Sequence, residues 1–266
     1  MLIRSMREVE AAGKLIVINH GEASACRVLL KADGAGFSVS EARMKTGSVA
    51  NLWYKNHWEA NYVRSGTATL EDIVGGRQWT LKTGDLYLVG PTDKHRMTAL
   101  SQEVFRVVSV FNPPIAGNET HDADNSYAAS GPVPPRKDPM LVRTPADVKA
   151  AGHTSEFSAK TGRIAHIITK ADGVGFSYSD VHLARGHRSD HTHKHHTMAS
   201  LVLEGNLEVT DKDGKTHTLS DGDLYCVGPG ETHSLHAIGD THMISVFNPP
   251  LVGTERLDAT GGYPIS

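Results

Sequence analysis

The chain has 266 residues, which is enough for one large domain or two of ordinary size. Its 27 basic and 30 acidic residues nearly balance, so the composition gives no reason to expect a nucleic-acid or membrane-surface partner. The N-terminal segment lacks the apolar core of a signal peptide, and no apolar run reaches membrane-spanning length, so we expect a cytoplasmic protein.

The same sequence blocks occur twice, in the same order. KADGAGFS at 31–38 recurs as KADGVGFS at 170–177, GDLYLVGP at 84–91 as GDLYCVGP at 222–229, and SVFNPP occurs at 109–114 and 245–250. Between the copies, residues 122–139 are rich in Pro, Ser, Asp and Gly and show no periodicity. The repeat predicts a first domain at 1–121, a linker at 122–139 and a second domain at 140–266.

Each copy opens with a short strand and a short helix and then continues as strands. The strand-like segments are short, are bounded by Gly, Asp or Pro, and have no helix alternating between them. Examples are CRVLLKA, GTATLEDI and FRVVSVF in the first copy, and RIAHIITKA, LEVTDKDGKTHTL and HMISVF in the second. The pattern predicts an all-β protein of two tandem jelly-roll barrels, each with a short N-terminal strand and helix.

Residues 190–205, DHTHKHHTMASLVLEG, contain four histidines within six residues. In a strand, His191 and His193 point to one face and can converge on one ion. A third histidine, His233, ends a later Gly-x-x-His segment. Imidazole nitrogen suits Zn, Fe, Ni and Cu. The order His-x-His, then Gly205, then Gly-x-x-His resembles the signature of the cupin family, and the resemblance implies a metal site made by these three histidines.

Both copies resemble ectoine synthase over essentially that enzyme's full length. The first copy carries MLIRSMREVE, KADGAGFS, NHWEA, GDLYLVG, VFNPP and GNETHDAD, and the second carries TKADGVGFS, GDLYCVG, ETH and SVFNPPLVGTE. The resemblance implies a metal-dependent lyase that closes N-γ-acetyl-2,4-diaminobutyrate into a tetrahydropyrimidine with loss of water. It implies Fe(II) as the ion, with Zn, Ni or Mn as alternatives. It also implies a dimer, so two fused copies predict a pseudo-dimer within one chain, with a further homodimer left open.

The resemblance also implies roles for individual residues. In the first copy it places the metal ligands on Glu59 and His95 with Tyr87, and the substrate contacts on Tyr54, Phe111, Glu119 and His121. In the second copy His233 and Tyr225 keep their places, but Met198 stands where the family has its Glu ligand, and Leu257 where it has a His. We therefore expect His191 and His193 to restore the second site. The residues predicted to act there in proton transfer or substrate binding are Tyr225, Glu255, Tyr178 and Phe247, and Tyr87 takes the corresponding catalytic role in the first copy.

Several positions near the substrate depart from the family. Ala23, Ala25 and Ala42 stand where the family has Trp, Ser and Thr, and Ser109 replaces a Cys. A substrate polar group left unpaired costs about 1–3 kcal/mol. The departures predict a small amino-acid-derived substrate that differs from that of ectoine synthase.

Two other functions fit the same residues. A three-histidine site is also used by cupin dioxygenases that bind Fe(II) and activate oxygen. A non-catalytic protein that binds a small molecule is the third interpretation. His195 and His196 are candidates for a general base or for orienting the metal ligands, with solvent exposure as the alternative.

Overall fold

The computed structural model describes residues 1–157 and 160–265, which form two compact units. We call Met6–Pro145 the first barrel, and Met1–Ser5 together with Ala146–Ser266 the second barrel. In each, a seven-stranded antiparallel sheet faces a four-stranded one across an apolar core. The predicted all-β architecture, with a short strand and helix before each barrel, is confirmed.

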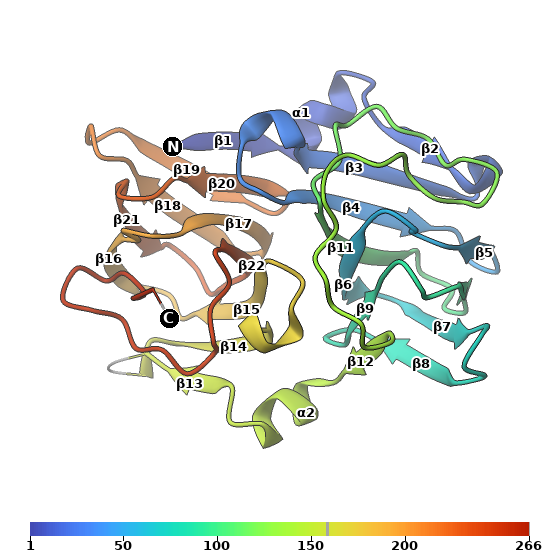
Figure 1. Ribbon diagram of the computed structural model, residues 1–266. Coiled ribbons are helices and arrows are strands. Elements are labelled where there is room, and N and C mark those ends of the chain that lie inside the picture. The colour runs from blue at the N-terminus through green and yellow to red at the C-terminus, as the bar shows by residue number, and fades with distance from the viewer. Residues whose placement is uncertain (158–159, 266) are drawn as a thin grey trace. The chain divides into compact units, whose positions relative to one another are not determined.

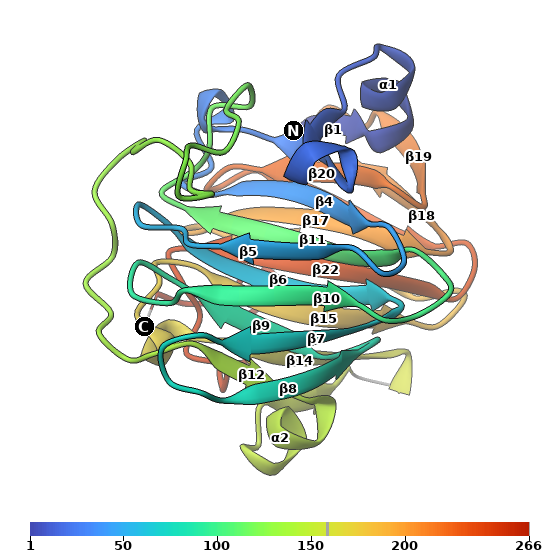
Figure 2. The same ribbon diagram turned by 90° about the vertical axis from the view of Figure 1, so that its right-hand side faces the viewer.

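In the first barrel the larger sheet has the order β12-β9-β6-β11-β4-β3-β2. The smaller sheet has the order β5-β10-β7-β8, and its strands lie one below another at the front of Figure 2. Helix α1 (Met6–Ala11) and the 3-10 turns at Asn19–Gly21 and Lys31–Asp33 complete this barrel. The strands are β2 (Ile16–Ile18), β3 (Ala23–Leu29), β4 (Ser38–Met44), β5 (Val49–Leu52), β6 (Trp58–Ser65), β7 (Thr67–Asp72), β8 (Gln78–Lys82), β9 (Leu86–Val89), β10 (His95–Ala99), β11 (Phe105–Asn112) and β12 (Leu141–Arg143).

The second barrel repeats this topology, with the orders β1-β20-β17-β22-β15-β14-β13 and β16-β21-β18-β19. Helix α2 (Pro145–Ala150) precedes its strands, and a 3-10 turn lies at Lys170–Asp172. The strands are β1 (Leu2–Ser5), β13 (Thr154–Glu156), β14 (Gly162–Ile168), β15 (Ser177–Leu183), β16 (Arg188–Thr192), β17 (Thr197–Glu204), β18 (Asn206–Thr210), β19 (Thr216–Ser220), β20 (Asp223–Val227), β21 (Thr232–Ala237) and β22 (Thr241–Asn248).

The first strand of each copy joins the sheet of the other copy. Strand β1, blue in Figure 1, pairs with β20 in the second barrel, with Ile3 opposite Tyr225. Strand β12 pairs with β9 in the first barrel, with Val142 opposite Tyr87. The compact units therefore differ from the predicted boundaries, since residues 1–5 belong to the second barrel and residues 122–145, including the predicted linker, to the first. A repeat in sequence identifies the strands but not the sheet edge that each one joins.

Side chains alternate across the strands, so each large sheet has one face toward its core. On β15, Val181 and Leu183 lie in the core of the second barrel, whereas Asp180 and His182 lie on the opposite face and are only partly buried. No helix among residues 1–157 and 160–265 is long and apolar enough to cross a membrane.

We predict that Gly205→Ala destabilises the protein far more than Gly214→Ala. Gly205 has a φ of +90°, and an added Cβ would lie 2.1 Å from the Asp240 carbonyl oxygen. Gly214 has a φ of +79° but open space around it. Left-handed backbone costs an alanine about 1–2 kcal/mol at either position. At Gly205 overpacking adds about 1–3 kcal/mol. Thermal unfolding midpoints measure the difference, and equal midpoints for the two variants would contradict this close approach of the strands.

Candidate metal centre

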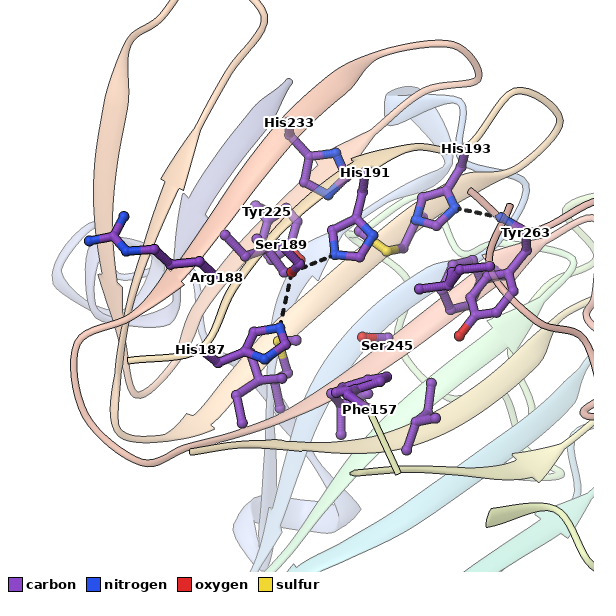
Figure 3. A pocket seen from close by; sticks show the side chains of 18 of the residues that line it. Phe157, His187, Arg188, Ser189, His191, His193, Tyr225, His233, Ser245 and Tyr263 are labelled. Carbon is purple, nitrogen blue, oxygen red and sulfur yellow. Dashed lines mark hydrogen bonds between the residues drawn. The ribbon is translucent and has the colours of Figure 1, made fainter. Parts of the chain in front are cut away.

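Three histidines of the second barrel line one cavity of about 180 Å³ (Figure 3). His191 on β16 lies directly opposite His233 on β21, and His193 follows the end of β16. The ring centroids are 5.5 Å apart for His191 and His233, 5.7 Å for His191 and His193, and 6.1 Å for His193 and His233. The fold thus brings together the three histidines that the sequence singled out.

Burial keeps these imidazoles in the neutral form that binds metals. It lowers the pKa of His193 to about 3 and that of His233 to about 4, and it also lowers the pKa of His191. Repulsion between neighbouring histidines lowers the pKa of His193 and of His233 further. Neither ring nitrogen of His233 makes a hydrogen bond of normal geometry among residues 1–157 and 160–265, although the nearby backbone of Glu231 acts to raise its pKa. A buried imidazole without partners is costly unless a ligand completes it.

The tautomer of His191 is fixed by its neighbours. Its Nδ1–H donates to the Gly261 carbonyl oxygen (2.8 Å), so Nε2 carries the lone pair and accepts from the Ser189 hydroxyl (2.8 Å). His187 Nε2–H in turn donates to the Ser189 oxygen (3.0 Å), as drawn in Figure 3. His193 Nδ1 faces the backbone N–H of Tyr263 at 3.3 Å. An ion shared by the three rings would replace the Ser189 contact and the long Tyr263 contact.

The walls of the cavity are mainly apolar. Met198 on β17 lies opposite Phe247 on β22, in the register that Glu59 and Phe111 have in the first barrel. The family's Glu position is therefore filled by a buried thioether. Tyr225 on β20 also lines the cavity, and its buried hydroxyl makes no hydrogen bond of normal geometry in the described part of the chain, although Ser200 on the neighbouring strand lies near enough to act on its pKa. Burial raises the pKa of Tyr225 to about 12, so this hydroxyl stays protonated at neutral pH.

Tyr178 was predicted to contact the substrate, and the structure places it outside the cavity. The described residues that line the cavity include Val181 and Leu183 of β15 but not Tyr178. Tyr178 is fully buried and lies on the opposite face of the strand, with Asp180 and His182.

Glu255 was predicted to act in proton transfer, and the structure gives its carboxylate a different role. The carboxylate accepts hydrogen bonds from the backbone N–H groups of Val252, Gly253 (2.7 Å) and Thr254 (3.1 Å), so it closes the turn after the Pro-Pro pair. Although burial alone would raise the pKa of Glu255, these backbone donors hold it below its ordinary value. An ionised carboxylate held in this way is a poor proton carrier, and Glu255 is outside the set of described residues that line the cavity.

The two remaining histidines of the cluster have different surroundings. His195 is exposed. His196 is buried and contacts the carbonyl oxygens of Pro249 (2.8 Å) and Pro264 (3.4 Å), so it ties together two loops near the cavity. Neither position suits a general base inside the barrel.

In the first barrel the predicted oxygen and nitrogen ligands are also buried. His95 Nδ1–H donates to the Asp93 carbonyl oxygen (2.9 Å), and its Nε2 has no partner in the part of the chain that the structure describes. Burial lowers the pKa of His95 to about 4 and raises that of Glu59 to about 8, although the nearby polar side chains of Asn61 and Ser109 act to lower the pKa of Glu59. Burial, and then the charge of Glu59, raise the pKa of Tyr87. The three groups therefore share one dry region of the barrel.

An aromatic cluster covers this region. Tyr54 stacks on Tyr127 with ring centroids 5.3 Å apart, and its hydroxyl lies 3.3 Å from His121 Nε2. Phe111 packs edge-on against Tyr54 at 5.5 Å. Tyr54, Phe111 and His121, which were predicted as substrate contacts, are thus brought together. Ala23 and Ala25, two of the positions that depart from the family, are buried in this barrel and offer no polar group to a substrate.

Glu119 reaches the aromatic cluster through Arg27. Its carboxylate accepts from the backbone N–H groups of Ala116 and Gly117 (2.7 Å), and its carbonyl oxygen accepts from Arg27 Nη2 (2.9 Å). The Arg27 guanidinium lies 5.1 Å from the centroid of the Tyr127 ring. A substrate-binding role for Glu119 stays a prediction.

Sequence reasoning missed Tyr127 and Tyr263. Tyr263 stacks on His193 at 5.7 Å and packs edge-on against Phe247 at 5.5 Å, so it closes the second barrel as Tyr127 closes the first. Each tyrosine lies 13 residues after the second proline of its Pro-Pro pair (114 to 127 and 250 to 263). This shared spacing was the available signal.

Solved structures share this fold at low sequence identity. An oxalate decarboxylase from Lactobacillus farciminis, in a formate complex, superposes with a TM-score of 0.68 at 16% identity, covering 95% of this chain and 87% of that one. A salicylate 1,2-dioxygenase from Pseudoaminobacter salicylatoxidans has a TM-score of 0.65 at 14% identity, covering 93% and 81%. The fold and the histidine-lined barrel define a cupin protein with two barrels.

The sequence matches identify the family within this fold. The ectoine synthase family model matches residues 1–131 and again 140–266. The L-ectoine synthase of Desulfosudis oleivorans is 38% identical over 128 residues, which are 96% of that protein and 48% of this chain. That of Oceanobacillus iheyensis is 43% identical over 101 residues, covering 77% and 38%. The chain belongs to the ectoine synthase family.

We predict that Glu59→Gln stabilises the metal-free protein at pH 8 but not at pH 4.5. A raised pKa means that the folded state holds a proton that the unfolded state has released. Protonated Glu59 contributes fully to the free energy of unfolding below pH 4.5, the pKa of the carboxyl in the unfolded chain. This contribution is lost as the pH rises toward about 8, the pKa in the folded protein. The loss is about 1.4 kcal/mol for each pH unit in that window. Gln keeps the shape without the ionisation.

Chemical denaturation in the presence of a chelator, at several pH values, measures this difference. Glu103→Gln, at an exposed glutamate, is the control. If Glu59→Gln and the parent keep the same stability difference from pH 4.5 to 8, Glu59 is not held in a dry environment.

Proposed function

We propose that the protein is a metal-dependent lyase of the ectoine synthase type and that its reaction takes place in the second barrel. The observation that carries the proposal is the cavity lined by His191, His193 and His233, in which His233 has two buried nitrogens without partners among the described residues. Membership of a family whose relatives are named L-ectoine synthase supports the reaction class.

The donor set fits a divalent transition metal, with Fe(II) favoured by the family resemblance. Three neutral imidazoles leave coordination positions open for water or substrate. A bound ion would supply Lewis acidity toward a substrate carbonyl or amide oxygen. The thioether of Met198 is too soft to take the place of the family's carboxylate toward a hard ion, so the His191 and His193 pair is needed at this site.

Tyr225 is the residue best placed to manage protons at this site. Its ring centroid lies 5.8 Å from that of His233, and its hydroxyl points to no partner in the described part of the chain. With a pKa of about 12 it remains a hydrogen-bond donor at neutral pH. It can therefore stabilise an oxygen that gains negative charge and give a proton to that oxygen as water leaves.

The cavity selects the size and character of the substrate. A volume of about 180 Å³ admits only a small molecule. Phe247, Tyr263 and Met198 form apolar walls that exclude water from the reacting atoms. These features favour a compact amino-acid derivative, such as an N-acylated diamino acid, that cyclises within the barrel.

We predict that Tyr225→Phe lowers kcat by about 10²–10⁴-fold, because it removes the proton donor. The assay supplies Fe(II) and N-γ-acetyl-2,4-diaminobutyrate, or a shorter or longer N-acyl diamino acid, and follows cyclised product by NMR. Tyr87→Phe makes the same change at the equivalent position of the first barrel. The iron content should be unchanged in Tyr225→Phe, so that its lower rate reports proton transfer.

The same pair of variants tests the placement of the reaction. If Tyr87→Phe abolishes turnover and Tyr225→Phe does not, the reaction belongs to the first barrel and the proposal is wrong. If none of these substrates is turned over by the metal-loaded parent, the cyclodehydratase assignment fails.

A second candidate function is Fe(II)-dependent oxygen activation. The replacement of a carboxylate ligand by a third imidazole favours it, because a site of three histidines is also suited to Fe(II). Oxygen consumption that requires both Fe(II) and an organic substrate would support this function, whereas cyclisation at the same rate without oxygen would exclude it.

A further inference from the structure

A second cluster of metal-binding side chains lies outside the barrel cavity. On strands β15 and β22, His182 and His242 lie directly opposite each other, and Asp180 precedes His182 by two residues on the same face. Asp180 Oδ1 accepts from His242 Nε2 (2.6 Å) and from His182 Nε2 (3.2 Å). The two imidazole rings stack with centroids 4.1 Å apart. One ligand atom of each residue lies within 4.8 Å of the other two.

This cluster is separate from the candidate reaction centre. Residues 181 and 183 of β15 line the barrel cavity, whereas Asp180 and His182 lie on the other face of the same strand. The side chains of His182, His242 and Asp180 are 35%, 20% and 13% exposed, so an ion can reach them from solvent. His182 and His242 line a cleft together with Glu204, Asp240 and Arg163.

The first barrel shows what the same positions do when they do not bind a metal. There Glu41 on β4 accepts from Arg43 Nε (2.7 Å) and from Arg106 Nη2 (2.7 Å), and Arg43 and Arg106 lie opposite each other in the register of His182 and His242. Arg64 on β6 adds a third cation at 2.6 Å. Guanidinium groups are always protonated and offer no lone pair.

The second barrel has lost all three of these cations. Histidines replace Arg43 and Arg106, and Leu203 stands at the strand position of Arg64 (β6 and β17 pair with β11 and β22 in the same register). The carboxylate is kept, as Asp180. Two imidazoles and a carboxylate offer nitrogen and oxygen donors where the first barrel has a closed ion-pair cluster. Binding through Nε2 requires only that each ring carry its proton on Nδ1.

We propose that Asp180, His182 and His242 form a second divalent-metal site, on the outer face of the large sheet of the second barrel. Two imidazoles and one carboxylate are a ligand set of zinc sites, with at least one further position left for water. The site takes Zn²⁺ or a similar transition ion and does not depend on the reaction in the barrel.

Zinc binding to the full-length protein tests the proposal. The starting variant is His191→Ala/His193→Ala, which removes two of the three histidines of the second-barrel cavity. Equilibrium dialysis against Zn²⁺ at pH 7.5, with metal counted by mass spectrometry, gives the number of bound ions per chain. Adding His182→Arg/His242→Arg installs the arginines of the first barrel, which can pair with Asp180 and so preserve the fold. We expect this change to remove one equivalent of zinc.

Two more variants sharpen the result. Asp180→Asn should weaken the same equivalent while keeping both imidazoles. His236→Arg is the matched control, because His236 pairs with the single carboxylate of Glu208 (2.8 Å) and should leave zinc binding unchanged. The proposal is overturned if the starting variant binds as much zinc with the two arginines as without them, or if His236→Arg causes the same loss.

Discussion

The cost of burying a polar group without a partner is the constraint on which this structure depends. The second barrel encloses His233 and Tyr225 with atoms that find no hydrogen bond in the described part of the chain, and the first encloses Nε2 of His95 in the same way. Each such group costs about 1–3 kcal/mol in a folded protein. Groups of this kind are retained where a ligand completes them, so each barrel places a small set of polar side chains within an otherwise apolar core.

Duplication allowed the two barrels to meet this constraint with different atoms. The first barrel retains the carboxylate of Glu59, and it has Leu52 opposite His95, where the second barrel has His191 opposite His233. The second barrel has lost the carboxylate to Met198 and supplies two imidazoles from β16 and the residues after it. Exchange of a carboxylate for imidazole removes negative charge from the ligand set and favours softer ions. The outer faces of the two large sheets differ as well, since arginines hold the carboxylate of Glu41 in the first barrel and histidines hold that of Asp180 in the second.

Much of this could be predicted from the sequence, because repeats and strand periodicity are local signals. The all-β class, the two barrels, the histidine triad and the equivalence of Tyr87 and Tyr225 all follow from motifs and their spacing. Alternation along β15 puts Tyr178 on the face of Asp180 and His182, opposite the residues of this strand that line the cavity.

Other features depend on contacts that a sequence does not state. Strand β1 pairs with β20 of the second barrel, and β12 pairs with β9 of the first. Because the two repeats carry the same strands, the sequence does not determine which sheet edge each of them joins. Asp180 and His242 are about sixty residues apart and meet only through the pairing of β15 with β22. Tyr127 lies in a segment that reads as a linker, and only the barrel shows that its ring is buried against Tyr54.

The most direct test of the central claim is the position of iron in crystals of the full-length protein loaded with Fe(II) under anaerobic conditions. Anomalous diffraction above and below the iron edge locates the ion without assumptions about activity. The account predicts a peak within bonding distance of His191, His193 and His233. A peak beside Glu59 and His95 with none in the second barrel would contradict it.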